Sequence, residues 1–417
     1  MTERHFPVRP NLEQLKHQAK DLLRTIRRGD PFATAELQEH HPERIPPGAA
    51  KLADAQLALA RSYGLPSWPR LVLACRMTDA IWRDDVNAVR ALVLKHPHLL
   101  HEEVTVRKSN WGPPMTYAAN LGRDRIITML RELGATDFLP ALGRAVLQGQ
   151  IGTARKLYEM AGRPRPPRGA VMGPAETQSG SGMAFLLELG AEICDARGDQ
   201  LAPVALLLET YCRNPQGKHQ CLELFVQQGI KLPDTPPMAV HRGRMDLLEE
   251  RLRRDPGLLA RTFHHEEIYP PELGCHADQS LALHGTPLAS GTLLHLCVDY
   301  DEIEIASWLL AHGMDVNVRA AVDAEGFGGH TALFGCVVSQ AYRVGLQEDA
   351  AFARLLLDHG ADVNVRASLR KRLRFVADES MHEYRGVTHL AWGQQFHDPD
   401  WVSQPAMRLI AKRGGQP

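Results

Sequence analysis

Nine residues occur almost unchanged at two places in the chain. They read HGMDVNVRA at residues 312–320 and HGADVNVRA at residues 359–367, and they differ only where Ala361 replaces Met314. Each segment overlaps the end of a helix-forming stretch that finishes in Leu-Leu-x-x-Gly, and glycine readily takes the left-handed conformation that closes a helix. Self-similarity at intervals of about 30 to 50 residues predicts a solenoid, in which each unit buries its apolar face against the next.

Further copies of the unit are more divergent. A clear one occupies residues 111–135, the last lies at residues 386–415, and degenerate copies fill much of the chain between residues 79 and 259. We count about nine units over residues 78–417, which predicts a single long array.

The best-preserved unit, residues 292–317, resembles the ankyrin repeat. The family's characteristic threonine, leucines, histidine, glycine and asparagine correspond to Thr292, Leu294, His295, Leu309, Leu310, Gly313 and Asn317. The resemblance implies an all-α, ankyrin-type helical solenoid with short β-hairpin or loop fingers and, by family habit, a protein partner. We expect Thr292 and Thr331 to cap helices through their hydroxyls. His295 is expected to tie one turn to the next by hydrogen bonds.

Residues 1–77 contain no copy of the repeat. Residues 10–29 have apolar side chains at helical spacing, end at Gly29, and carry Arg24, Arg27 and Arg28 near that end, where cations favour the helix dipole. Because the first unit of a solenoid needs a water-tolerant outer face, we interpret residues 1–77 as a small helical N-terminal capping module. A separate functional domain is the alternative.

Composition narrows the classes of protein. The chain is 44% hydrophobic with a net charge of −1, so composition favours neither nucleic acid nor an anionic membrane. The first residues lack the apolar core of a signal peptide, and no apolar run reaches about 18 residues. The seven cysteines are scattered without a CxxC pair, which favours reduced, mostly buried thiols. We therefore expect a monomeric, cytoplasmic protein that does not contact membranes.

The first departure from the plain repeat is an insertion at residues 262–291. It is rich in histidine and carboxylates and includes Cys275, but it lacks the HExxH or paired spacings that fix a metal geometry. A polar surface insertion is the main interpretation. A metal site or a hidden hydrolase is the alternative.

The second departure is a long finger at residues 319–331. Glycines at 326, 328 and 329 surround Phe327 and permit sharp turns. We expect an extended hairpin that exposes Phe327 as an anchor for a partner. The segment lacks the Lys-Ser/Thr of a phosphate-binding P-loop. The candidate contact residues of the finger are Asp323, Glu325, Phe327 and His330.

The third departure, residues 366–387, begins with a basic cluster. Such a cluster suits an anionic partner, but no stack of aromatic residues accompanies it, so nucleic acid is disfavoured. Equivalent loops of a solenoid stack on one side, which predicts that this loop and the finger are neighbours. The candidate contact residues here are Arg366, Arg370, Lys371, Arg372 and Arg374.

The catalytic patterns GxSxG, Walker A, GxGxxG and HExxH are absent from the sequence. A proline-rich basic stretch at residues 161–174 is interpreted as a linker between repeats. The sequence therefore predicts a non-enzymatic scaffold without catalytic residues, cofactor or metal, which binds an unidentified protein through its concave face and loops. The alternative is a receptor for a small anionic ligand or nucleic acid, using residues 366–374 and 326–329.

Overall fold

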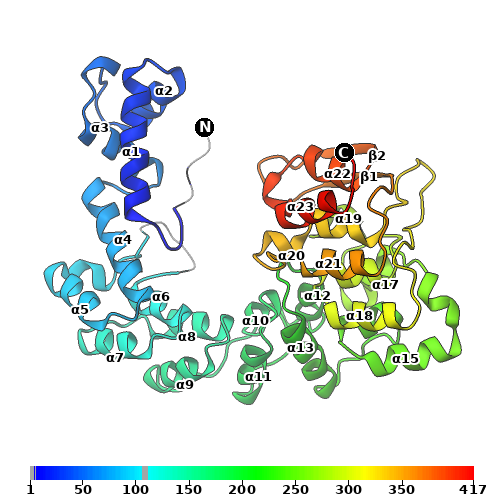
Figure 1. The fold of residues 1–417 in the computed structure, drawn as a ribbon. Coiled ribbons are helices and arrows are strands. Elements are labelled where there is room, and N and C mark those ends of the chain that lie inside the picture. Colours follow the sequence, from blue (N-terminus) through cyan, green and yellow to red (C-terminus); the bar gives the residue numbers. More distant parts are fainter. Residues whose placement is uncertain (1–3, 5, 106–110) are drawn as a thin grey trace. The chain divides into compact units, whose positions relative to one another are not determined.

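The computed structural model describes residues 4, 6–105 and 111–417, and these fold into two compact units (Figure 1). Unit 1 spans Met1–Pro164 and unit 2 spans Arg165–Pro417. Their boundary lies inside the predicted linker, whose residues 163–167 have no regular secondary structure. The described residues are predominantly helical and contain one two-stranded sheet, which confirms the predicted all-α class.

Unit 1 begins with three helices that share a core. The predicted first helix is confirmed as α1, with Asn11 as its N-cap and Leu15, Ala19, Leu22 and Ile26 buried. Helix α4 runs through residue 77, so the predicted division at 77/78 falls within a helix, and that division remains a prediction. The elements of unit 1 are α1 (Leu12–Arg27), α2 (Pro31–His40), η1 (Pro47–Ala49), α3 (Leu52–Ser62), α4 (Trp68–Trp82), α5 (Val86–Lys95), η2 (Pro97–Leu100), α6 (Pro114–Asn120), α7 (Asp124–Glu132), α8 (Phe138–Leu147) and α9 (Ile151–Met160).

Unit 2 continues the pattern of short paired helices and adds a β-hairpin near its end. Its first part contains α10 (Met172–Glu176), α11 (Gly180–Glu188), α12 (Ala202–Glu209), α13 (Pro215–Gln227), α14 (Pro236–His241), α15 (Met245–Arg254), η3 (Pro256–Ala260), α16 (His265–Ile268), η4 (Pro271–Leu273) and η5 (Gln279–Leu281). Its second part contains α17 (Leu293–Asp299), α18 (Ile303–Ala311), α19 (Ala332–Val337), α20 (Gln340–Arg343), α21 (Ala351–Asp358), β1 (Ala367–Arg372), β2 (Met381–Val387), α22 (His389–Gln395), η6 (Pro399–Trp401) and α23 (Gln404–Lys412).

The near-identical segments make the same contacts one repeat apart. Asn317 donates from Nδ2 to the Gly360 carbonyl at 3.2 Å, and its Oδ1 accepts from the Asp362 amide at 2.7 Å. Asn364 bonds the next turn in the same way, to the Gly414 carbonyl and the Gln416 amide. Each asparagine therefore joins the turn of one repeat to the turn of the next by two hydrogen bonds. This shared role explains why the same nine-residue segment occurs at two places in the chain.

Buried histidines provide a second set of links between repeats. His295 donates from Nε2 to the His330 carbonyl at 3.1 Å, which confirms its expected role. Its Nδ1 accepts from the Thr292 amide, and burial lowers the pKa of His295 to about 3, so the ring is neutral. The two threonines differ as caps: Thr292 forms a capping box with His295 at the start of α17, whereas Thr331 makes no capping bond and its hydroxyl bonds the His389 ring instead.

Strands β1 and β2 pair antiparallel in the segment that was expected to be a basic loop. The side chains of β1 alternate between the interior and the surface, as a half-buried strand requires. Ala367, Leu369 and Lys371 face inward, whereas Arg370 and Arg372 lie on the outer face. The hairpin turn, residues 373–380, connects the two strands.

Candidate functional site

The finger at residues 319–331 lies against the hairpin, as the sequence predicted. The Gly328 amide donates to the Ser368 carbonyl at 2.7 Å, which joins the finger to β1. Arg370 donates to Asp323 at 2.8 Å and also pairs with Glu325. Three candidate residues are therefore brought together, and the charge of Arg370 is satisfied within the group.

The expectation that Phe327 is exposed is wrong. Its side chain is only 4% exposed, because the guanidiniums of Arg370 and Arg385 lie over its ring at 4.9 and 4.2 Å from the centroid. Arginine prefers the face of an aromatic ring, so the two cations and the ring form a closed stack. Phe327 thus fastens the finger to the hairpin and presents no face to a partner.

The other candidate residues also have partners within the chain. His330 is buried and donates to the Pro287 carbonyl, and Lys371 is buried beneath the hairpin. Arg366 and Arg372 are exposed but bond the carbonyls of Gly386 and Glu379. The basic residues therefore do not form one continuous exposed cluster. Arg374 differs from the others because its guanidinium lies beside the Phe375 ring.

The glycines of the finger leave no cradle for a phosphate. The amides of Gly326, Gly328 and Gly329 donate to the carbonyls of Asp323, Ser368 and Ala320, and the Phe327 amide donates to the Asp323 carboxylate. A Cβ on Gly328 would lie 2.1 Å from the Ala321 oxygen. These glycines therefore allow close backbone packing, and their donors are already used.

A groove of about 1130 Å³ opens elsewhere in unit 2, where the hairpin turn faces α12 and α20. Its volume is slightly above the usual range for ligand pockets, about 300–1,000 Å³. Residues distant in sequence line it, and most of its surface is apolar. The apolar and aromatic lining residues include Ala202, Ala205, Leu206, Tyr211, Leu283, Val344, Phe375, Val376 and Trp401.

Phe375 stands on the rim of this groove and has the exposure that was expected of Phe327. Its side chain is 77% exposed, and the Arg374 guanidinium lies 4.9 Å from its ring centroid. Its φ is +61°, a left-handed conformation that is unfavourable for a bulky residue by about 1–2 kcal/mol. The Phe375 amide donates to the Glu379 carboxylate at 2.7 Å, which helps to hold the turn.

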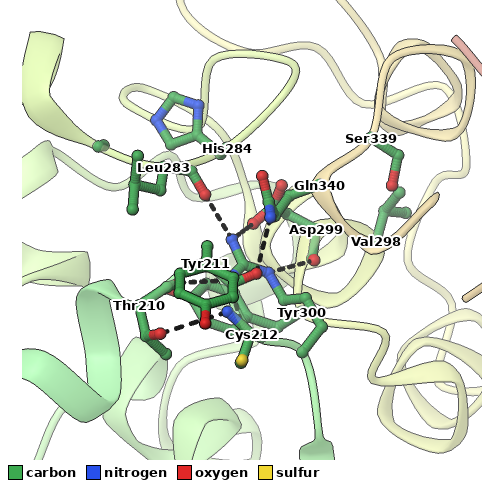
Figure 2. A network of polar contacts seen from close by, with 12 residues as sticks. Thr210, Tyr211, Cys212, Leu283, His284, Val298, Asp299, Tyr300, Ser339 and Gln340 are labelled. Atoms are coloured by element: carbon green, nitrogen blue, oxygen red, sulfur yellow. Dashed lines mark hydrogen bonds and ion pairs between the residues drawn. The ribbon is translucent and has the colours of Figure 1, made fainter. Parts of the chain in front are cut away.

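Beneath the groove, Arg213 joins three segments of unit 2. Its guanidinium donates to the carbonyls of Thr210, Cys212, Leu283 and Asp299 and to the Asp299 carboxylate, over distances of 2.7–2.9 Å. Figure 2 shows these acceptors converging from the α12 end, the 283–284 segment and α17. All five N–H donors of the side chain are used, so this buried cation is fully satisfied.

The charge of Arg213 is retained in spite of its burial. Burial is the largest effect and opposes the charge, but Asp299 together with Tyr300 and Tyr269 raises the pKa of Arg213 above its ordinary value. The ring of Tyr300 lies 4.4 Å from the guanidinium. Arg213 therefore fixes Thr210, Tyr211 and Leu283, three of the residues that line the groove.

Lys371 ties the hairpin to the same floor. Its Nζ lies 3.2 Å from the Ala282 carbonyl and 3.3 Å from Nδ1 of His284. Burial lowers the pKa of Lys371 to about 7, and burial followed by the charge of Lys371 lowers the pKa of His284 well below its usual value. The lysine thus positions β1 and, through it, the turn that bears Phe375.

The described residues do not supply a metal centre. Within them, no group of three His, Cys, Asp or Glu side chains is placed to hold a metal ion, including in the 262–291 insertion. Ser380, His382 and Asp378 are neighbours, but Nε2 of His382 faces both the serine and the aspartate. A catalytic triad needs the two ring nitrogens to face these groups separately, so this cluster does not form one.

Sequence reasoning missed Arg213, Tyr211, Gln340 and Phe375. One signal could have found the orientation of the hairpin: Ala367, Leu369, Lys371 and Leu373 alternate with polar residues, which is typical of a half-buried strand. No local pattern marks Arg213, because its partners lie up to 86 positions away.

The seven cysteines form no disulfide, and all except Cys212 are buried, as expected for scattered thiols. In the part of the chain that the structure describes, no helix is long and apolar enough to cross a membrane.

Comparison with known proteins identifies one segment by sequence. The family model named Ankyrin repeat matches residues 291–321, the unit that contains α17 and α18. Among solved structures, the crystal structure of the human ASB11 ankyrin repeat domain aligns with 73% of this chain and 99% of that domain. The two are 17% identical, with a TM-score of 0.25. A search of curated proteins finds no match.

Proposed function

Since the chain is an ankyrin-repeat protein, we propose that it is a non-enzymatic scaffold that binds another protein through the groove of unit 2 and its hairpin turn. Ankyrin repeats generally mediate protein interactions, and stacked repeats present preformed surfaces with little ordering cost on binding.

The exposure of Phe375 is the observation that carries this proposal. A large aromatic side chain that stands 77% exposed in a left-handed backbone conformation contributes little to the fold and adds strain. Exposed aromatic and arginine side chains beside an apolar groove are typical of interface hot spots. Arg374 and Phe375 provide this pair, and Tyr211 and Val344 add exposed apolar surface in the groove.

The surface first suggested by the sequence gives less support to a contact. Arg370, Asp323 and Glu325 are paired with one another, and Phe327, His330 and Lys371 are buried. We therefore propose that the partner contacts Arg374 and Phe375. Of the residues first suggested by the sequence, we retain only Arg374 and its neighbour Arg372, which lie at the hairpin turn.

Site-specific photocrosslinking tests the proposal in the full chain. A photoreactive phenylalanine analogue is placed at position 375 and, as a matched control, at position 32, where Phe32 of α2 is 81% exposed. We expect a defined protein to crosslink at 375 and not at 32. The purified partner should then bind Phe375→Asn at least about tenfold more weakly than the wild type, since tenfold corresponds to about 1.4 kcal/mol and loss of a hot spot costs at least about 2 kcal/mol.

Asparagine is chosen because it tolerates the left-handed backbone at this position, so the variant should fold. The Phe32→Asn variant should retain wild-type affinity. Equal affinity of the wild type and the Phe375→Asn variant for the crosslinked protein would refute this placement of the contact.

A further inference from the structure

We propose that the groove of unit 2 binds an extended peptide segment in which bulky apolar side chains lie between a basic and an acidic residue. This inference rests on the proposed scaffold function and adds the chemistry of the partner. It is carried by the sorted charges of the groove, its apolar lining and two buried polar atoms without partners.

The charged residues of the groove are sorted by the segment from which they come. Glu176, Asp199 and Glu209 belong to the region of α10 and α12, and Glu209 pairs with His276, whereas Arg343 ends α20 and Arg374 lies in the hairpin turn. Neither arginine forms an ion pair with any described residue, in contrast to Arg370. The groove therefore offers carboxylates on one set of elements and guanidiniums on another.

Complementary charge follows from this sorting. A basic side chain of a bound peptide is favoured beside Glu176 and Asp199, and a carboxylate is favoured beside Arg343 and Arg374. Arginine binds a carboxylate with two parallel hydrogen bonds, which fixes orientation as well as affinity. Charge order therefore sets the direction in which the peptide lies.

The lining of the groove is suited to apolar side chains. Ala205, Leu206, Leu283 and Val344 line it, and Phe375 stands at its rim. Burying one large aliphatic or aromatic side chain contributes about 1.5–3 kcal/mol. The volume of about 1130 Å³ is sufficient for more than one such side chain.

Two polar atoms in the groove wall favour a peptide over a purely apolar ligand. Oε1 of Gln340 and Nε1 of Trp401 are buried and have no hydrogen-bond partner among the described residues. Leaving such a group unsatisfied costs about 1–3 kcal/mol. A peptide unit carries one donor and one acceptor, which are the two kinds of group that these atoms lack.

A random peptide library displayed on phage tests the inference against the full-length protein. Selection on the wild type should enrich peptides with a basic residue, an apolar core and an acidic residue at constant spacing. A synthetic peptide of the enriched sequence should bind the Arg343→Glu/Arg374→Glu variant about tenfold more weakly, because two attractive contacts become repulsive. Arg408→Glu, an exposed arginine of α23 outside the groove, is the matched control and should bind as the wild type does.

Charge exchange makes the test specific. Replacing the acidic residue of the peptide by lysine should restore binding to the Arg343→Glu/Arg374→Glu variant and weaken binding to the wild type. Peptides that depend on Phe375 but show no charge order would overturn this inference and leave the proposed scaffold function intact. If enrichment is the same on the wild type and on Phe375→Asn, the groove is not a peptide site and both proposals fail.

Discussion

Phe327 and Phe375 lie in neighbouring surface segments of unit 2, and each has an arginine guanidinium 4.9 Å from its ring centroid. Their environments nevertheless differ. Phe327 is 4% exposed and lies beneath a second arginine, whereas Phe375 is 77% exposed at the tip of the hairpin. An arginine–phenylalanine pair is thus buried in one segment and exposed to solvent in the other.

The difference arises from what each arginine does with its charge. The charge of Arg370 is balanced by Asp323 and Glu325, and its guanidinium is held over the Phe327 ring. Arg374 has no carboxylate partner among the described residues, and it shares the rim of the groove with Phe375. An arginine beside an aromatic ring therefore indicates a binding surface only where the charge is not already satisfied.

The largest effect is expected for Phe327→Ala. Removing a buried aromatic side chain leaves a cavity beneath two guanidiniums, and such changes lower the free energy of unfolding by about 3–5 kcal/mol. Phe375→Ala is the matched control and should change it by less than about 0.5 kcal/mol. Urea unfolding of both variants checks the comparison, and equal losses would show that burial does not separate the two residues.

A smaller loss is expected for Arg370→Glu. The new carboxylate would face Asp323 and Glu325 and would remove one cation from the Phe327 ring. Because the Arg370 side chain is 32% exposed, solvent screening limits the loss of unfolding free energy to about 1–2 kcal/mol. Arg372→Glu, the next outward arginine of β1, is the control, and a loss as large as that of Arg370→Glu would contradict the specific pairing.

Lys371→Met should stabilise the hairpin and alter its pH dependence. The folded pKa of Lys371 is about 7, and the unfolded value is about 10.4, so the unfolded chain binds more protons between these limits. Wild-type stability should therefore rise with pH from about 7 to about 10, and the burial penalty is present in full below pH 7.

Methionine removes the buried ammonium and keeps most of the side-chain volume. We expect a gain of at least about 1 kcal/mol at pH 7, or roughly 2–4 °C in Tm, and a flatter pH profile above pH 7. Lys412→Met, at an exposed position of α23, should change neither. A lower Tm for Lys371→Met would show that the contacts with Ala282 and His284 outweigh the burial of charge.

Local pattern explains which parts of this fold could be predicted. The unit at 292–317 was recognisable because its leucines, glycine and asparagine act within one repeat or on the next. The adjacency of the finger and the hairpin followed from the repeat spacing. The burial of Phe327 could not be predicted in this way. It depends on Arg370 and Arg385, whose guanidiniums lie over its ring, and these arginines belong to strands in a segment that we expected to be a loop.

The groove could not be predicted for a related reason. Its lining runs from Glu176 to Trp401, and no periodic pattern connects these positions. Arg213 supports the floor of the groove through hydrogen bonds to Asp299 and Leu283, and both residues lie far from it in the sequence. A binding surface made between repeats is a property of packing, so repeat recognition alone finds the array and not the site.

The smallest effect on stability is expected where we expect the largest effect on binding. Phe375→Asn removes an exposed ring and places a residue that tolerates positive φ at a strained position. The free energy of unfolding should stay within about 0.5 kcal/mol of the wild type or rise slightly, whereas affinity for a groove-bound peptide should fall at least about tenfold. Calorimetry and a peptide-binding assay on one preparation measure both. A loss of stability comparable to that of Phe327→Ala would mean that Phe375 packs in solution as Phe327 does, and the contrast between an open and a closed arginine–aromatic pair would no longer hold.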